Sequence, residues 1–332
     1  MAARASEASS YTRRAATRRI IAIIAALVLL VVAYLGVAAF VVSERLLDFV
    51  NVEKNLDRPR GDPPASPFAL GYPGDPMQAF GYAFETIDIA GELGPLPAWL
   101  VPGKSGAVGE MWGIHVHGMG GHRQDGYKMM SVLRELDVPT LLISYRNDRD
   151  VARTKEGVYT FGVTEWADLE AAVELAMSRG AKRIVLGGDS MGGAIIGTFL
   201  RKSEHSGIVT ALVLDAPALD MRAIVDHITE EMGVPLADQI GPLSLKIVSA
   251  RLGFDLTEEV TVGVISGFGG PLFEVHGTAD HLVPVSLSDR LVASRSEPTL
   301  YLRTKADHVL SWQADPELYR SSLAGFLSGV VR

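Results

Sequence analysis

The feature that most restricts the fold of this 332-residue chain is a serine set between glycines, where an apolar run meets a helix-forming run. Residues 184–186 lead into Gly188-Asp-Ser190-Met-Gly192, and residues 194–201 follow at once. A turn this sharp exposes the serine hydroxyl and crowds its neighbours, so positions 188 and 192 must hold glycine or a very small residue. The motif predicts a strand–turn–helix unit with Ser190 at its apex.

Beyond residue 80, short apolar runs alternate with amphipathic runs of helical period. This alternation predicts an α/β fold with a mostly parallel sheet that is covered by helices on both faces. The expected strands cover residues 84–89, 98–101, 112–117, 140–145, 184–186, 210–214, 272–276 and 299–303, and further helices cover residues 127–136, 163–178 and 316–327. Residues 216–270 exceed a normal crossover and predict a small lid or an elaborated helix layer.

Composition excludes several classes of site. The chain has no cysteine, which rules out disulfides, thiolate metal ligands and a cysteine nucleophile. The net charge is −8, although residues 1–19 carry five arginines against one glutamate. The rest of the chain is therefore strongly acidic, which argues against nucleic acid as a partner.

Ile20 and Val42 bound a run of 23 uncharged residues. As a helix this run would be about 34 Å long, enough to cross the hydrocarbon core of a membrane. Arg13, Arg14, Arg18 and Arg19 lie just before it, so the positive-inside rule predicts a cytoplasmic N-terminus and an extracytoplasmic catalytic domain. A cleaved signal peptide is the alternative, with Val37-Ala38-Ala39 as cleavage site, but its apolar region would usually be shorter.

These patterns predict four parts of the chain. Residues 1–19 form a basic cytoplasmic tail, and residues 20–42 form the transmembrane helix. Residues 43–78 contain a juxtamembrane segment and a spacer rich in proline and glycine. Residues 79–332 form the catalytic domain, with residues 216–270 as the possible lid.

A serine hydroxyl needs a base to become a nucleophile, and histidine suits that role near neutral pH. Of the eight histidines, His308 follows the last expected strand and lies well beyond a suitable acid. That acid is Asp280, four residues after an apolar strand, and Asp215 is the second choice. Asp307 is discounted because residues adjacent in sequence rarely face each other.

Two backbone amides are expected to hold the oxyanion. One belongs to Met191, directly after the nucleophile, and the other to Met119 in the loop His117-Gly118-Met-Gly-Gly121. His117 precedes Ser190 in the chain and is expected to be structural. A metal site at His115 and His122 is disfavoured, because these two lack the i, i+4 spacing of zinc proteases and have no glutamate between them.

The ordered motifs resemble those of the α/β-hydrolase family over about residues 80–330. The branch that they resemble most contains prolyl-oligopeptidase-like and monoacylglycerol-lipase-like serine hydrolases. The matching elements are His117-Gly118, Tyr145-Arg-Asn147, Gly188-Asp-Ser-Met-Gly192, His276-Gly-Thr-Ala-Asp280-His-Leu-Val-Pro284 and Ala306-Asp-His308.

The resemblance implies an eight-stranded sheet with an antiparallel second strand, an acyl-enzyme intermediate and no cofactor. It implies that Ser190 is the nucleophile, Asp280 the acid and His308 the base. One departure is the loop Tyr145-Arg-Asn-Asp148, where many relatives have glycine after the arginine. We expect this loop to alter the rim of the pocket.

The sequence therefore predicts a membrane-tethered serine hydrolase that cleaves a small-molecule or lipid-like ester, without a metal. Two alternatives are open. A peptidase acting on N-terminal residues would need an acidic cluster to hold a free amine, for which Glu230 and Glu231 are candidates. A non-catalytic binding protein could use the same fold, because fold does not fix function.

Overall fold

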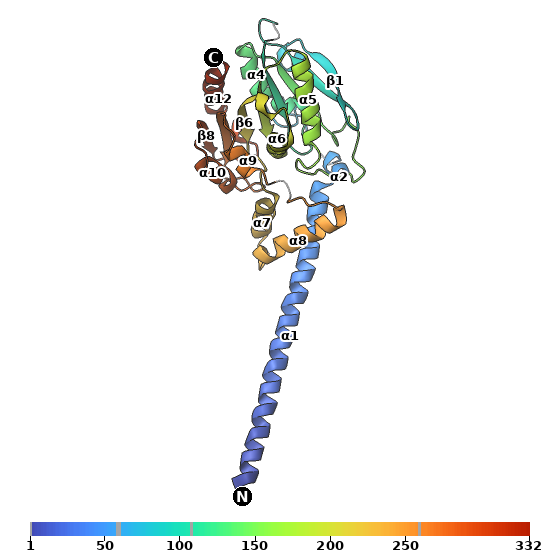
Figure 1. Ribbon diagram of the computed structural model, residues 1–332, viewed down its shortest axis with the longest axis vertical. Helices are drawn as coiled ribbons and strands as arrows, with labels where there is room; N and C mark the ends of the chain where they lie inside the picture. Colours follow the sequence, from blue (N-terminus) through green and yellow to red (C-terminus); the bar gives the residue numbers. More distant parts are fainter. Residues whose placement is uncertain (1, 58–60, 107–108, 258–259) are drawn as a thin grey trace.

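A computed structural model describes residues 2–57, 61–106, 109–257 and 260–332 (Figure 1). The described residues form one eight-stranded sheet with the order β1-β2-β4-β3-β5-β6-β7-β8. β2 is antiparallel to β1 and β4, and every other pair is parallel. This confirms the predicted α/β fold, with its mostly parallel eight-stranded sheet and its antiparallel second strand.

The strands differ in exposure according to their place in the sheet. β3, β7 and most of β5 and β6 are buried along their length, whereas the edge strand β1 is exposed at several positions. The strands are β1 Glu85–Gly91, β2 Gly94–Val101, β3 Met111–Val116, β4 Thr140–Ile143, β5 Arg183–Asp189, β6 Val209–Asp215, β7 Leu272–Gly277 and β8 Thr299–Thr304.

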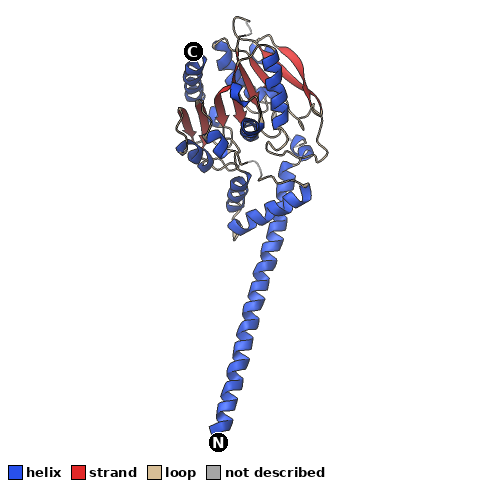
Figure 2. Cartoon of the chain, viewed as in Figure 1, coloured by secondary structure: helices blue, strands red, loops and turns tan. Residues whose placement is uncertain are grey.

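Helices flank the sheet on both faces (Figure 2). The helices are α1 Ala2–Val50, α2 Val52–Leu56, α3 Pro76–Phe80, α4 Tyr127–Glu135, α5 Trp166–Ser178, α6 Met191–Lys202, α7 Met221–Glu231, α8 Ala237–Leu252, α9 Val262–Ser266, α10 Ser286–Ala293, α11 Ser311–Ala314 and α12 Pro316–Val331. Two short 3-10 turns, Arg123–Gly126 and Ser206–Ile208, complete the described helical structure.

Alternate side chains of β5 pack into two separate cores. Ile184 and Leu186 join the core that contains α5 and α6, and Val185 joins the core that contains α4 and α12. α5 begins at Trp166 rather than at the expected residue 163. The Glu165 carboxylate accepts hydrogen bonds from amides of the preceding loop, which holds that loop out of the helix.

Helix α1 projects from the rest of the molecule (Figure 1). By length and composition, its part from Ala16 to Val50 could cross a membrane. Its last third is packed rather than free, because Val42, Leu46 and Val50 are buried in the same core as residues of α8, which α1 contacts. The helix thus continues into the folded domain without a break.

The proline- and glycine-rich segment after α2 lies against the helices that flank the sheet. The Phe68 ring centroid is 4.6 Å from that of Trp312, and the Tyr127 hydroxyl donates a hydrogen bond to the Gly74 carbonyl at 2.8 Å. Aromatic contacts and prolines fix this segment without regular secondary structure.

Ser190 lies at the turn between β5 and α6, with φ 51° and ψ −116°, in a strained region of backbone conformation. A Cβ on Gly192 would lie 2.1 Å from the Val116 carbonyl oxygen of β3. A Cβ on Gly188 would lie 2.8 Å from the Gly192 carbonyl carbon and 2.9 Å from the Gly193 nitrogen. These distances confirm that both positions require glycine.

Gly192→Ala should destabilise the protein, because the new methyl group would overlap the backbone of β3. Overpacking of this kind costs about 1–3 kcal/mol, which corresponds to a fall in melting temperature of roughly 2 °C or more for a domain of this size. Gly325→Ala is the control, since a Cβ there meets nothing within 4 Å on α12, and it should melt slightly higher. A melting temperature of Gly192→Ala at or above that of the wild type would contradict the packing described here.

Candidate active site

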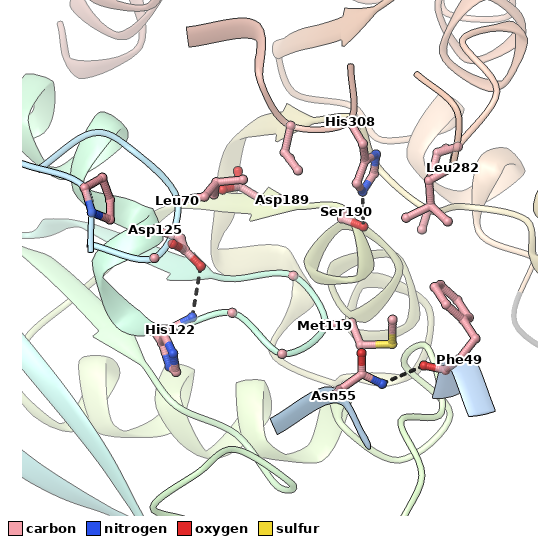
Figure 3. Close-up of a pocket in the computed structure, with 18 of the residues that line it drawn as sticks. Phe49, Asn55, Leu70, Met119, His122, Asp125, Asp189, Ser190, Leu282 and His308 are labelled. Atoms are coloured by element: carbon pink, nitrogen blue, oxygen red, sulfur yellow. Dashed lines mark hydrogen bonds between the residues drawn. The ribbon is translucent and has the colours of Figure 1, made fainter. Parts of the chain in front are cut away.

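Three of the predicted site residues lie together at the carboxyl ends of three parallel strands of the sheet. Ser190 follows β5, Asp280 follows β7 and His308 follows β8. The His308 Nε2 lies 2.8 Å from the Ser190 Oγ (Figure 3). The His308 Nδ1 lies 2.7 Å from the Asp280 Oδ2. Because the carboxylate only accepts, Nδ1 carries the proton, and Nε2 is free to accept the serine proton.

The Asp280 carboxylate is stabilised in its charged form. Burial acts to raise its pKa, but hydrogen bonds from His276 and His308 and from the Val283 amide outweigh burial and hold the pKa well below its usual range. Its second oxygen accepts from the Leu282 and Val283 amides at 2.9 and 2.8 Å. Asp280 therefore stays ionised beside the imidazole of His308.

Behind Asp280 lies a buried chain of hydrogen bonds that the sequence did not reveal. The His276 Nε2 lies 3.1 Å from the Asp280 Oδ2 and 3.0 Å from the Val283 carbonyl, so this nitrogen must carry a proton. The His276 Nδ1 lies 2.7 Å from the Ser288 hydroxyl. Ser288 is also hydrogen-bonded to the Glu274 Oε1, and its single proton can go to His276 only when Glu274 is protonated and donates to Ser288.

The protonation of Glu274 agrees with its surroundings. Its side chain is fully buried in the sheet, and burial raises its pKa well above the usual value. The neutral Glu274 carboxyl group thus orients the Ser288 hydroxyl, and this hydroxyl orients the His276 ring. The ring in turn orients the Asp280 carboxylate toward His308.

The loop after β3 is braced by a second buried histidine. The His117 Nε2 lies 2.9 Å from the Asp148 Oδ2, and its Nδ1 lies 2.9 Å from the Gly118 carbonyl. Burial acts to lower the pKa of His117, but attraction and hydrogen bonding to Asp148 raise it above its usual value. The Tyr145 hydroxyl donates to the His117 and Gly118 carbonyls, both at 3.0 Å, and further restrains the loop.

The departure at residues 145–148 has a different consequence from the one expected. Asn147 has φ 74°, a left-handed conformation that glycine adopts freely and asparagine tolerates. Its side chain bonds the Val158 carbonyl and the Thr154 amide. These residues do not line the main pocket, so the expected change of its rim is wrong, and Asp148 instead supports His117.

The two expected oxyanion donors belong to segments that adjoin Ser190. Met191 is the first residue of α6, where a backbone amide has no acceptor within the helix. A Cβ on Gly118 would lie 3.2 Å from the Ser190 Cβ, so the loop before Met119 touches the nucleophile. Met119, Ser190 and His308 line one pocket (Figure 3). The donor roles themselves stay a prediction.

Asp215, the second choice as acid, belongs to a different group of buried charges. Its Oδ2 accepts from Lys128 and from the Tyr319 hydroxyl, both at 3.1 Å. The Lys128 Nζ also lies 3.6 Å from Asp189, the residue before the nucleophile. A lysine within the apolar run of residues 127–133 was the signal in the sequence that could have predicted this buried cluster.

The other candidates lie apart from the nucleophile. Asp307 accepts from the backbone amides of His281 and His308 rather than from the imidazole. Glu230 and Glu231 are exposed at the end of α7 and do not line the main pocket. His115 is buried 3.5 Å from Asp189, and His122 lies on the pocket wall. Among the described residues, the group that could hold a metal ion is Glu170, Glu174 and His205, away from the pocket.

The pocket at Ser190 has a volume of about 620 Å³ and is mostly apolar, within the usual range for small-molecule sites. Its walls come from distant parts of the chain. They include the end of α1, the segment at residues 61–64 and 70–73, α7 and the loops that carry Leu282 and Val309. The sequence did not predict that the segment after α2 would cover the site.

Comparisons with known proteins agree with this architecture. No family model matches the chain. The uncharacterized protein YfhR of Escherichia coli (strain K12) is 24% identical over 264 residues, covering 77% of this chain and 83% of YfhR. The uncharacterized protein YqkD of Bacillus subtilis (strain 168) is 23% identical over 221 residues, covering 65% of this chain and 71% of YqkD.

Solved esterases share the fold. The Pyrococcus furiosus esterase Pf2001 superimposes with a TM-score of 0.60 at 19% identity, over 82% of this chain and 100% of the esterase. Est1E from Butyrivibrio proteoclasticus, solved with ferulic acid bound, gives a TM-score of 0.55 at 17% identity, over 74% of this chain and 99% of Est1E. The chain has the α/β-hydrolase fold.

Glu274→Gln should change how stability depends on pH. The pKa of Glu274 is raised in the folded protein above its ordinary value of 4.5. The wild-type protein therefore loses stability as the pH rises above 4.5, by up to about 1.4 kcal/mol per pH unit. Glutamine does not ionise and loses none. The melting temperature of the variant minus that of the wild type, measured on the full chain in detergent, should therefore increase from pH 4.5 toward pH 8. A difference that is constant over this range would show that Glu274 is not held neutral.

Asp148→Asn should impair catalysis without removing a reacting group. The variant loses the charge that orients His117 and hence the loop carrying Met119, and misplacement of catalytic groups costs up to about 100-fold in rate. We expect kcat for a soluble ester to fall at least about 10-fold, with little change in KM. Asp150→Asn, on the exposed end of the same loop, is the control. Equal kcat values for the two variants would contradict the bracing role.

Proposed function

We propose that this chain is a membrane-anchored serine hydrolase that cleaves a carboxylic ester through an acyl-enzyme intermediate. The observation that carries the proposal is the pair of hydrogen bonds joining Ser190, His308 and Asp280, at 2.8 and 2.7 Å. The strained backbone at Ser190 and the apolar pocket around it support the same conclusion.

In the proposed reaction, the Ser190 Oγ attacks the ester carbonyl carbon while the His308 Nε2 takes the hydroxyl proton. Asp280 stabilises the imidazolium that forms. The Met119 and Met191 amides donate hydrogen bonds to the carbonyl oxygen as it becomes negative. His308 then passes the proton to the leaving alcohol oxygen as the carbon–oxygen bond breaks, which leaves the acyl group on Ser190.

A water molecule completes the proposed cycle. It attacks the acyl carbonyl carbon while His308 removes its proton, and the same amides hold the second oxyanion. His308 returns that proton to the Ser190 Oγ when the acid leaves. No metal or organic cofactor takes part in these steps.

An ester suits the pocket better than a peptide with a free amine. Three carboxylates line the pocket; Asp62 is exposed to solvent, and the other two are already engaged within the protein. Asp125 accepts from the His122 amide at 2.9 Å, and Asp189 faces Lys128 and His115. The structural neighbours named above are esterases, which favours the same substrate class for this chain.

The anchor in the proposal is the apolar part of α1. The arginines before residue 20 favour a cytoplasmic N-terminus, which would place Ser190 on the outer side of the membrane. The continuity of α1 into the domain supports an anchor over a cleaved signal. Ala39, at the possible cleavage site, is only 1% exposed and belongs to the hydrophobic core.

A fluorophosphonate probe tests the nucleophile. The full-length wild type should be labelled rapidly, Ser190→Ala should not be labelled, and His308→Ala should react far more slowly, because the hydroxyl loses its base. Ser178→Ala, on the exposed end of α5, is the matched control and should behave as the wild type. Equal labelling of wild type and Ser190→Ala would refute the assignment, and a folded wild type that is not labelled would favour the non-catalytic binding protein.

A further inference from the structure

Helix α1 presents an apolar surface to its surroundings even where the domain already packs against it. Val37, Phe40 and Val41 are 66%, 53% and 49% exposed, whereas Ala39 and Val42 on the opposite side are nearly buried. Large exposed apolar side chains on a helix of this kind belong in an apolar solvent. If α1 is the anchor proposed above, the membrane therefore extends at least to the level of Val41.

The turn between α7 and α8, residues 232–236, lies below that level. The Tyr34 hydroxyl donates a hydrogen bond to the Pro235 carbonyl at 2.9 Å, which fixes the turn beside α1. Tyr34 precedes Val41 by seven residues, or about 10 Å along the helix axis. That depth corresponds to elements that lie in the boundary between lipid headgroups and acyl chains, which are buried by about 5–10 Å.

The surface of this turn is apolar at its tip. Met232 is 52% exposed and Leu236 is 48% exposed. Leu236 has φ 62° and ψ 38°, and it is the N-cap of α8 without a side-chain cap. Asparagine or aspartate would suit both the left-handed backbone and the cap, whereas leucine is strained in that backbone and offers no capping oxygen. A strained and uncapped leucine that is also exposed indicates a contact that needs its apolar side chain.

Charged neighbours limit how deep the turn can lie. Glu230, Glu231 and Asp238 are exposed close to the tip in sequence. Carboxylates are costly in hydrocarbon, so they must stay among the headgroups while Met232 and Leu236 reach the acyl chains. Their negative charge also favours zwitterionic over anionic lipids.

The helices that reach the membrane also form walls of the pocket. Ile224 of α7 and Phe49 near the end of α1 line the same pocket as Ser190. Phe49 lies eight residues beyond Val41, about 12 Å farther along the axis. Because the exposed carboxylates beside the turn stay among the headgroups, the headgroup layer, roughly 5–7 Å thick, lies below Val41, and the pocket wall at Phe49 lies about 12 Å outside the membrane.

We propose that the turn at residues 232–236 is a second membrane contact, and that the substrate is an acyl ester of a zwitterionic lipid that enters the pocket between α1 and α7. This inference rests on the ester hydrolysis proposed above. It adds the substrate class and the direction from which the substrate arrives. Figure 1 shows α7 and α8 on the side of the domain from which α1 projects.

The membrane contact can be tested without measuring catalysis. Because the chain has no cysteine, Leu236→Cys can be labelled uniquely with a nitrobenzoxadiazole fluorophore. Leu318→Cys on α12, where leucine is 44% exposed, is the matched control. In phosphatidylcholine vesicles that contain spin-labelled lipid, the full-length chain should show at least two-fold quenching at position 236 and almost none at position 318. Equal quenching at the two positions would overturn the contact.

The substrate class is tested with paired aspartate variants. Met232→Asp/Leu236→Asp is compared with Met177→Asp/Leu318→Asp, which replaces a similarly exposed methionine and leucine on α5 and α12. The first pair should lower hydrolysis of phosphatidylcholine in vesicles at least ten-fold and leave hydrolysis of a soluble short-chain aryl ester within two-fold. The second pair should change neither rate.

The outcomes separate the two proposals. A wild type that cleaves the soluble ester but not phosphatidylcholine would overturn the lipid substrate and leave the hydrolase intact. Equal loss on both substrates in the first pair would show a general defect and contradict the entrance. A wild type that cleaves no ester would refute the proposed function, while the quenching experiment would still decide whether the turn contacts the membrane.

Discussion

The site depends on one close contact between backbones, where the start of α6 passes the end of β3. Gly192 lies so near the Val116 carbonyl that no side chain fits between them. Because β3 and β5 are parallel neighbours, this contact sets Ser190 directly against the loop that begins at His117. The same geometry that strains the serine backbone brings the loop that precedes Met119 against Ser190.

The acid and base side of the site is held by buried polar groups rather than by packing alone. The Asp280 carboxylate is oriented by a hydrogen-bonded chain of His276, Ser288 and neutral Glu274. The loop after β3 is held by the hydrogen bond between His117 and Asp148. Buried polar groups are costly unless they are paired, so these hydrogen bonds favour one geometry, although the Asp148 Oδ1 and the Glu274 Oε2 have no hydrogen-bond partner among the described residues. These two supports explain how a site built from four separate loops can be rigid.

Local patterns predicted the sheet, the turn at Ser190 and the order of the motifs. The spacing of apolar residues and the positions of required glycines can both be recognised within a short stretch of sequence. The order of Ser190, Asp280 and His308 also predicted which three side chains would meet. The cover formed by residues 61–73 was not predictable, since it has no periodicity and depends on distant contacts such as Phe68 with Trp312. The packing of α8 on α1 was not predictable either, because an apolar helix face can contact either lipid or another part of the protein.

The central claim is that Ser190 carries the acyl group during turnover. The most direct measurement is intact-protein mass spectrometry after a short incubation of the full-length chain with an aryl ester and an acid quench, followed by peptide mapping. The account predicts a mass increase equal to the acyl group, located on the peptide that contains Ser190. Ester turnover without any covalent adduct, or with an adduct on another residue, would contradict it.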